Sequence, residues 1–338
     1  MIPAAVFDGS IESFLEPIRD LLADPSVSEI MLNGPEEIWV ERQGRLSLTG
    51  SRFPSAGALA AALTNIAQYA GRTIGPASPI LEAHLPDGSR VEAVLGPLAH
   101  GGPAVAIRRF GGAALTIGRL VASGSLTAEA ARVLERAVAG RRNLVVSGGT
   151  GSGKTSLLGA LSSFAPEGER IIVIEDTREI RLQRPHVVHL ETRSADERGR
   201  GLVTIRDLLA ATLRLRPDRI VVGEVRGPEA FDLIQAMNTG HGGSLTTVHA
   251  NSPRDALRRL ESLALLADAA MPLAALRAQV AAAVHVVVQV ERAADGRRRV
   301  SAIEAVRGLM PDGEHAMAPL FRLDDAGRLV RARRKEQR

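Results

Sequence analysis

Residues 147–155 read SGGTGSGKT, and they follow the apolar run NLVV at residues 143–146. Residues 148–155 match the pattern GxxxxGK[ST], between a predicted strand and a helix-forming stretch, which is the context that indicates a phosphate-binding loop. We predict that backbone N–H groups and the positive end of the following helix bind phosphate oxygens. The predicted nucleotide-binding residues are Gly148, Gly149, Thr150, Gly151, Ser152, Gly153, Lys154, Thr155 and Ser156.

Lysine is rare in this chain, because only Lys154 and Lys335 are lysines among 42 basic residues. A compact ammonium group suits a phosphate cradle better than a planar guanidinium does. We therefore expect Lys154 to contact the β- and γ-phosphates of ATP, and the Thr155 hydroxyl to contact Mg²⁺. The alternative is a flexible glycine–serine loop that binds nothing.

The composition limits the kind of protein. A length of 338 residues predicts about two domains, and the absence of cysteine excludes disulfides and thiolate metal sites. The first nine residues lack the basic and apolar parts of a signal peptide, and the apolar stretch 280–290 is too short to span a bilayer. We expect a soluble cytoplasmic protein.

The net charge of +4 comes from the last eight residues, RARRKEQR, since residues 1–330 contain 37 basic and 37 acidic residues. Nucleic-acid binding normally needs a basic face, so a neutral body argues against DNA or RNA as the main partner. We expect residues 331–338 to be a disordered basic tail. The alternative for the tail is a contact with anionic lipid or an acidic partner.

Residues 1–110 predict a small α+β domain. Helices are expected at 11–24, with Pro17 as a flaw, and at 55–69, and strands at 28–32, 37–42, 45–48 and 104–108. Turns are expected at Asn33-Gly34, Gln43-Gly44 and Asp87-Gly88. Residues 111–126 contain four glycines without a sustained period, so they are expected to form a linker with a short helix.

Residues 127–330 predict an α/β domain, because strands and helices alternate. Strands are expected at 143–146, 170–174, 187–190, 219–222 and 244–248, and helices at 127–139, 204–215, 228–238, 252–267 and 273–284. A hairpin is expected around Asp295-Gly296. This order predicts a mostly parallel sheet covered on both faces.

Acidic residues follow two of these strands. Glu175 and Asp176 come after IIVI, and Glu224 comes after IVVG. Nucleotide hydrolysis needs one carboxylate near Mg²⁺ and one that orients water, at the carboxyl ends of strands beside the phosphate-binding loop. The spacing does not decide which carboxylate does which, and the alternative is that either pair caps a loop or a helix.

Histidines and arginines are further candidates. His241 and His249 lie eight residues apart, which does not make a metal pair, but either could sense the γ-phosphate instead of being structural. An arginine beside the transferred phosphoryl group accelerates its transfer. The candidates are Arg90, Arg108, Arg109, Arg206, Arg214, Arg216 and Arg226, and the alternative for each is a solvated or structurally paired side chain.

These segments together resemble a secretion-superfamily ATPase of the CpaF/TadA type. The similarity is close over SGGTGSGKT, over IEDTREI at 174–180 and over the unbroken run 208–261. It is looser over 28–46, 85–94 and 106–110. Little sequence precedes the first strand, and in this the chain is also similar to the conjugation ATPase TrbB.

The resemblance implies a RecA-like ATPase domain and a hexameric ring on the cytoplasmic face of an inner membrane, where ATP hydrolysis moves a platform protein. It also implies that Glu175 activates water and that Glu224 lies near Mg²⁺. Residues 239–251 match a histidine box containing His241 and His249, and Arg90, Arg108 and Arg109 approach the nucleotide. The alternatives are a RecA-like nucleic-acid translocase and a nucleotide-gated scaffold with little turnover.

Overall fold

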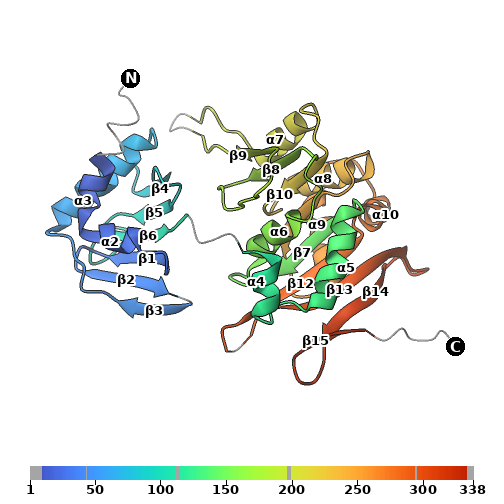
Figure 1. The fold of residues 1–338 in the computed structure, drawn as a ribbon. Helices are drawn as coiled ribbons and strands as arrows, with labels where there is room; N and C mark the ends of the chain where they lie inside the picture. Colours follow the sequence, from blue (N-terminus) through green and yellow to red (C-terminus); the bar gives the residue numbers. More distant parts are fainter. Residues whose placement is uncertain (1–9, 43, 111–114, 196–198, 294, 333–338) are drawn as a thin grey trace. The chain divides into compact units, whose positions relative to one another are not determined.

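The computed structural model describes residues 10–42, 44–110, 115–195, 199–293 and 295–332. The chain divides into two compact units, Met1–Ala113 and Ala114–Arg338. Figure 1 shows unit 1 in blue to teal and unit 2 in green to red. Each unit has its own sheet and its own hydrophobic core.

Unit 1 is a six-stranded antiparallel sheet in the order β3-β2-β1-β6-β5-β4. Its strands are β1 (Val27–Asn33), β2 (Glu37–Arg42), β3 (Arg45–Leu48), β4 (Ile80–His84), β5 (Arg90–Val94) and β6 (Ala104–Arg108). Helix α3 (Ala56–Tyr69) begins where the Ser55 hydroxyl accepts a hydrogen bond from the backbone N–H of Ala58. Such a cap satisfies one of the N–H groups that a helix start leaves free.

The predicted helix at 11–24 is interrupted in the structure. Residues 10–14 are helical, followed by the 3₁₀ turn η1 (Glu16–Ile18) and then α2 (Arg19–Ala23). Pro17 lies in the 3₁₀ turn, since its ring and missing N–H are incompatible with a continuous α-helix. Of the predicted turns, Gln43-Gly44 falls partly outside the described residues.

Unit 2 is built on a nine-stranded sheet in the order β15-β14-β13-β12-β7-β11-β10-β8-β9. Neighbours from β12 to β9 are parallel, and neighbours from β12 to β15 are antiparallel. The parallel strands are β7 (Leu144–Gly148), β8 (Ile171–Glu175), β9 (Val187–Glu191), β10 (Arg219–Val222), β11 (Leu245–His249) and β12 (Val286–Arg292). The others are β13 (Arg298–Leu309), β14 (His315–Leu323) and β15 (Leu329–Arg331).

Helices cover both faces of this sheet, as the alternating pattern predicted (Figure 1). Leu144 and Val146 of β7 belong to one core cluster and Val145 to the other, since alternate side chains of a strand point to opposite faces. The first cluster includes residues of α4 (Ile117–Ala122), α5 (Ala128–Ala139) and α6 (Lys154–Ser162). The second includes residues of α7 (Ile205–Thr212), α8 (Glu229–Asn238), α9 (Pro253–Leu265) and α10 (Leu273–Ala283).

Two predicted boundaries differ from the structure. Residues 111–114 of the expected linker lie outside the described residues, but Leu120 and Leu126 are buried in the core of unit 2. Much of the segment 115–126 therefore packs as part of unit 2. At the other end, Arg331 of the expected tail belongs to β15 and pairs with Glu129, while residues 333–338 lie outside the described residues.

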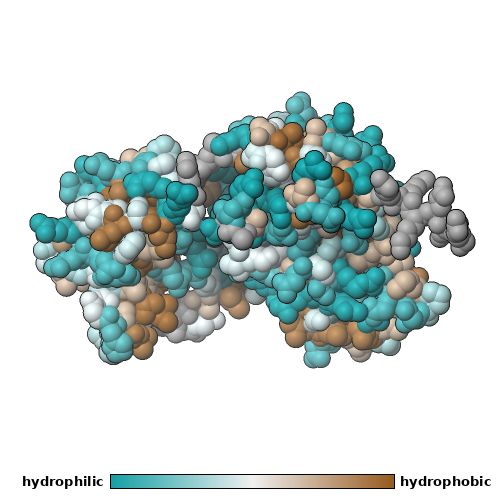
Figure 2. All heavy atoms as spheres, turned by 90° about the horizontal axis from the view of Figure 1, so that it is seen from below, coloured by the Kyte–Doolittle hydropathy of each residue, from teal (hydrophilic) through white to brown (hydrophobic). Residues whose placement is uncertain are grey.

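Among the described residues, no helix is both long and apolar enough to cross a membrane. On the face shown in Figure 2, hydrophobic residues form small patches separated by hydrophilic ones.

Candidate nucleotide-binding site

The loop between β7 and α6 leaves room for phosphate. At Gly148 a Cβ would collide with the Val290 carbonyl oxygen of the neighbouring strand, so only glycine fits there. Gly151 and Gly153 have φ values of 69° and 93°, which glycine adopts without a steric cost. By contrast, a Cβ at Gly149 or Gly151 would meet no atom within 4 Å. The loop is therefore open on the side where a ligand approaches.

The start of α6 offers backbone donors to an anion. Its N-cap is Gly153, and no side chain caps the first turn. The N–H groups at a helix start, together with the helix dipole, attract negative charge. The Ser152 hydroxyl turns back and donates to the Gly149 carbonyl oxygen at 2.8 Å, which stabilises the turn. Thr155 and Ser156 lie in the first turn of the helix.

Lys154 is directed into the loop. Its Nζ donates to the Gly149 carbonyl oxygen at 3.0 Å and lies 3.4 Å from both ring nitrogens of His249. The side chain is buried, with 7% of the residue exposed. Burial lowers the pKa of the Lys154 ammonium and Arg226 contributes in the same direction, while Glu224 opposes the shift. The buried cation lacks a carboxylate in direct contact among the described residues, so a phosphate oxygen would complete its environment.

Glu224 is the centre of a cluster of charged side chains. Its Oε1 lies 2.7 Å from Nε2 of His249, and its Oε2 accepts from Nε of Arg226 at 2.9 Å. Arg226 also lies 3.7 Å from Oδ2 of Asp176. Burial raises the pKa of Asp176, and the charge of Arg226 partly offsets that rise. Burial, Lys154 and Arg226 lower the pKa of His249, whereas Glu224 raises it.

Glu175 ends β8 and is almost completely buried, with 4% of the residue exposed. Its Oε1 accepts hydrogen bonds from the backbone N–H groups of Glu179 and Ile180 at 3.0 and 2.9 Å. Its Oε2 lies 4.0 Å from Nδ1 of His189. Burial raises the pKa of Glu175 to about 7, even though the two backbone donors favour the charged form. A carboxylate with such a pKa is suited to accept a proton near neutral pH.

Gly223 stands between the two acidic strand ends. Its backbone N–H donates to the Ile174 carbonyl oxygen at 2.8 Å, which places it beside Glu175. A Cβ at this position would lie 2.9 Å from Cγ of Glu175. A residue with a side chain, such as aspartate, therefore does not fit at position 223, because the stem of Glu175 fills that space.

The structure brings one of the two predicted histidines to this cluster and leaves the other at the opposite edge of the sheet. His241 precedes β11, at the amino edge of the sheet, where the Gly243 N–H donates to Asn143 before β7 begins. The loop 148–155 lies at the opposite, carboxyl edge, so His241 is not brought to Lys154 within one chain. His249 is brought there, because it pairs with Gly148 across the two strands.

Three of the seven candidate arginines, Arg90, Arg108 and Arg109, belong to unit 1. Arg90 pairs with Glu82 at 2.9 Å, and Nη1 of Arg109 donates to the carbonyl oxygens of Asp24 and Val27. Arg108 is exposed at the end of β6. Within unit 1, the contacts of Arg90 and Arg109 stabilise local structure, and their role toward a nucleotide stays a prediction.

Sequence reasoning gave no specific role to some residues that contact the site. Arg226 was one of several candidate arginines, and only its position two residues after Glu224 indicated that it contacts that carboxylate. Gln289 accepts from the Ser147 hydroxyl and donates to the Ala250 carbonyl oxygen, linking three strand ends. Its position in an apolar strand, where a polar residue needs partners, was the available signal.

The donor set fits a magnesium ion bound together with phosphates. The carboxylate of Glu224, whose Oε1 lies 2.7 Å from Nε2 of His249, offers oxygen ligands of the kind that Mg²⁺ prefers. Asp176 and the Thr155 hydroxyl would add further oxygens. Within the described ranges no group of three or more histidines or carboxylates could hold a metal alone.

Comparisons with known proteins show which family the chain belongs to. Residues 12–314 match the family described as Type II/IV secretion system protein. The chain is 38% identical over 299 residues to a putative conjugal transfer protein of Mycobacterium tuberculosis, covering 87% of this chain and 84% of that protein. It is 37% identical over 301 residues to the conjugal transfer protein TrbB of Rhizobium radiobacter, covering 87% and 89%. The crystal structure of the pilus retraction motor PilT with bound ADP has a TM-score of 0.60 and 19% identity, covering 90% and 84%.

The fold and the loop at 148–155 define a RecA-like P-loop protein. Within that class, the match over most of its length shows that this chain belongs to the Type II/IV secretion system protein family. The similarity to secretion-system and conjugation ATPases that the motifs predicted is confirmed at this level.

Proposed function

We propose that this protein is an ATP-hydrolysing motor of a secretion or pilus-assembly system. Mg-ATP binding and hydrolysis in a hexameric ring would move an inner-membrane platform protein, with the ring held at the cytoplasmic face of that membrane. The observation that carries the proposal is the contact of Lys154 with His249, and of His249 with Glu224, at one edge of the sheet. It joins a phosphate-binding lysine to a carboxylate suited to Mg²⁺.

The relatives support the choice of ligand and of system. One similar structure is a pilus retraction motor that contains ADP, and one similar sequence is a conjugal transfer protein. Family membership supports a secretion system as the setting, since the matched family is defined by such systems.

In this proposal the loop N–H groups and Lys154 bind the phosphates. Thr155, Glu224 and Asp176 hold Mg²⁺, whose charge would stabilise the phosphate oxygens as negative charge shifts during the reaction. Glu175 accepts a proton from the attacking water, which its raised pKa favours near neutral pH. His249 contacts both Lys154 and Glu224, so it can report occupancy of the site along β11.

The remaining predicted residues act through the assembly. In this proposal Arg90, Arg108, Arg109 and His241 meet a nucleotide in the assembled ring. An arginine supplied from outside the loop would stabilise charge on the transferred phosphoryl group.

The test is the Mg²⁺-dependent release of phosphate from ATP by the full chain. Lys154→Ala is expected to lower kcat about 100-fold or more, because it removes a cation from the phosphates. Lys335→Ala is the matched control, since it removes the only other lysine of the sequence and is expected to keep the wild-type rate. A Lys154→Ala protein that hydrolyses ATP like the wild type would refute the proposal.

A further inference from the structure

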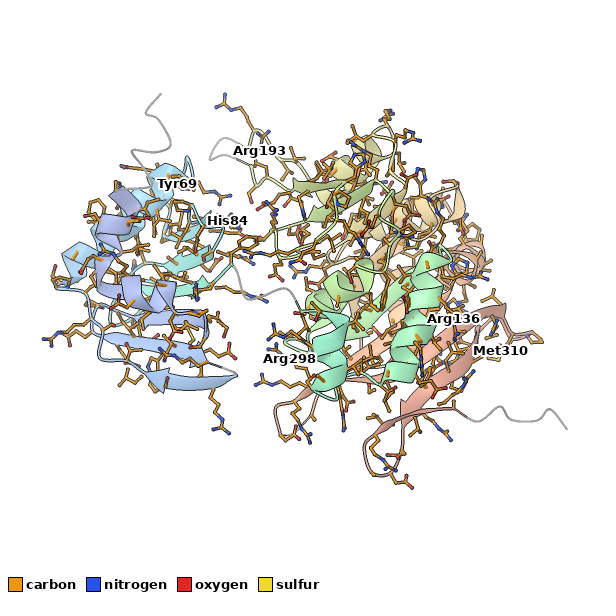
Figure 3. The ribbon with its side chains drawn as sticks, viewed as in Figure 1. Tyr69, His84, Arg136, Arg193, Arg298 and Met310 are labelled. Carbon is orange, nitrogen blue, oxygen red and sulfur yellow. The ribbon has the colours of Figure 1, made fainter. Side chains whose placement is uncertain are left out.

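Arg298 (labelled in Figure 3) is the first residue of β13, and it lies against the phosphate-binding loop. A Cβ placed on Gly153 would be 3.3 Å from Cδ of Arg298, so the aliphatic part of the arginine covers the start of α6. Gly153 thus has two reasons to be glycine, its φ of 93° and the close approach of this side chain.

Arg298 differs from the arginines on either side of it. Arg297 donates to Asp295 at 2.6 Å, and Arg299 donates to Glu291 at 2.9 Å and to the Gly327 carbonyl oxygen. Within the part of the chain that the structure describes, no hydrogen bond or ion pair occupies the guanidinium of Arg298. The residue is exposed, so its guanidinium is available to a ligand at the loop.

The order of strands decides which part of a nucleotide could reach Arg298. Glu175, Glu224 and His249 follow or end β8, β10 and β11, which lie on one side of β7. Arg298 lies on the other side, on β13 beyond β12. The terminal phosphate belongs beside the acidic residues and Lys154, and the nucleoside is joined to the opposite end of the phosphate chain. The nucleoside must therefore leave the loop toward β12 and β13.

We propose that Arg298 packs its guanidinium plane against the purine base of the bound nucleotide and so contributes to nucleotide specificity. The inference rests on the proposed binding of ATP, and it names Arg298 as the residue that contacts the base of that nucleotide. A guanidinium is planar and weakly hydrated, and it stacks on aromatic rings better than an ammonium does. The stem of Arg298 lies over Gly153, so its guanidinium is already beside the loop before the base binds.

The test separates the base from the phosphates. Calorimetric titration of the full-length Arg298→Ala protein with Mg-ADP is expected to give a Kd about three- to tenfold weaker than wild type. The Kd of tripolyphosphate, measured by its competition with ADP, is expected to be the same for Arg298→Ala and for the wild type. Arg298→Lys is expected to behave like Arg298→Ala, because it keeps the charge and loses the plane.

Arg297→Ala is the matched control, since it removes an exposed arginine of the same hairpin and is expected to bind ADP like the wild type. If Arg298→Ala weakened the binding of ADP and of tripolyphosphate equally, or if Arg298→Lys bound ADP like the wild type, Arg298 would contact a phosphate and the inference would be overturned. Unchanged ADP binding in Arg298→Ala would overturn it as well. Loss of activity in Lys154→Ala tests the proposed function separately, so either idea can fail alone.

Discussion

Glu175 combines burial with an expected chemical role, and the two conflict. Its carboxyl is held among β8, Gly223 and the turn at 179–180, where a charge is poorly solvated. The folded protein therefore favours the neutral form, which is the origin of the raised pKa. The proposed catalytic role needs the charged form, whose formation in this buried position costs free energy that depends on pH.

The cost predicts how stability depends on pH. The pKa of Glu175 is about 7 in the folded state, compared with 4.5 for an ordinary glutamate, so the unfavourable contribution is absent below pH 4.5 and grows as pH rises to 7. We expect Glu175→Gln to raise the free energy of unfolding by up to about 3 kcal/mol at pH 8 and to change it little at pH 4.5. Thermal and urea unfolding at both pH values measure this.

Glu167→Gln is the control for that experiment, because Glu167 is largely exposed and should not change the pH dependence. In the wild type, the ATP hydrolysis rate should rise through pH 7 as Glu175 loses its proton. The Glu175→Gln substitution should abolish most of the hydrolysis activity. An equal stability difference at both pH values would contradict the assignment of the raised pKa to this carboxyl.

At the scale of elements, Asn143 joins the strands that build the site. Its Oδ1 accepts from the Gly243 and Ser244 N–H groups at 2.7 and 3.0 Å, and its Nδ2 donates to the Ala283 carbonyl oxygen at 2.7 Å. These bonds connect the start of β7 with the start of β11 and the end of α10. Asn143 is fully buried, so water cannot replace the lost partners.

We expect Asn143→Ala to lower the free energy of unfolding of unit 2 by about 3 kcal/mol, because it leaves two donors and one acceptor buried and unpaired. Urea denaturation measures the change. Asn238→Ala is the matched control, since the exposed Asn238 amide also donates to a backbone carbonyl near α10, that of Gln279. A loss below 1 kcal/mol for Asn143→Ala would mean that the segments are held together mainly by packing.

Most elements could be predicted from the sequence because their apolar runs are bounded by turn residues and caps. The strands at 37–42, 45–48, 104–108 and 219–222 match β2, β3, β6 and β10 at both ends. In contrast, β14 and β15 were not predicted, and β14 contains Pro319, which argues against a strand. The structure accommodates Pro319 where the register between β13 and β14 shifts, next to Glu304.

The sequence predicted which candidate residues lie at the ends of strands, but it did not predict how their side chains pack. That Glu224 and His249 meet follows from parallel strands ending at one edge of the sheet, which the motif order implies. The packing of Glu175 on Gly223 depends on a side-chain direction that sequence spacing does not encode. The same is true of Arg298, whose contact with Gly153 requires β12 to lie between β7 and β13.

At the scale of the whole molecule, the proposed ring makes an activity prediction. If each nucleotide site is completed by a neighbouring subunit, ATP hydrolysis per mole of protein should rise with protein concentration and level off when assembly is complete. Light scattering over the same concentrations measures the assembly. Constant specific activity across a range in which the molar mass changes from monomer to oligomer would contradict a shared site.

One consequence of the lysine composition is practical. The sequence has two lysines, and Lys154 is deeply enclosed with a lowered pKa, which makes its amine more nucleophilic at a given pH. Reagents that acylate amines thus have few targets in this chain, and one of them is inside the proposed phosphate cradle. Chemical labelling, which on most proteins is spread over dozens of amines, would here be limited to Lys154, Lys335 and the amino-terminal amine.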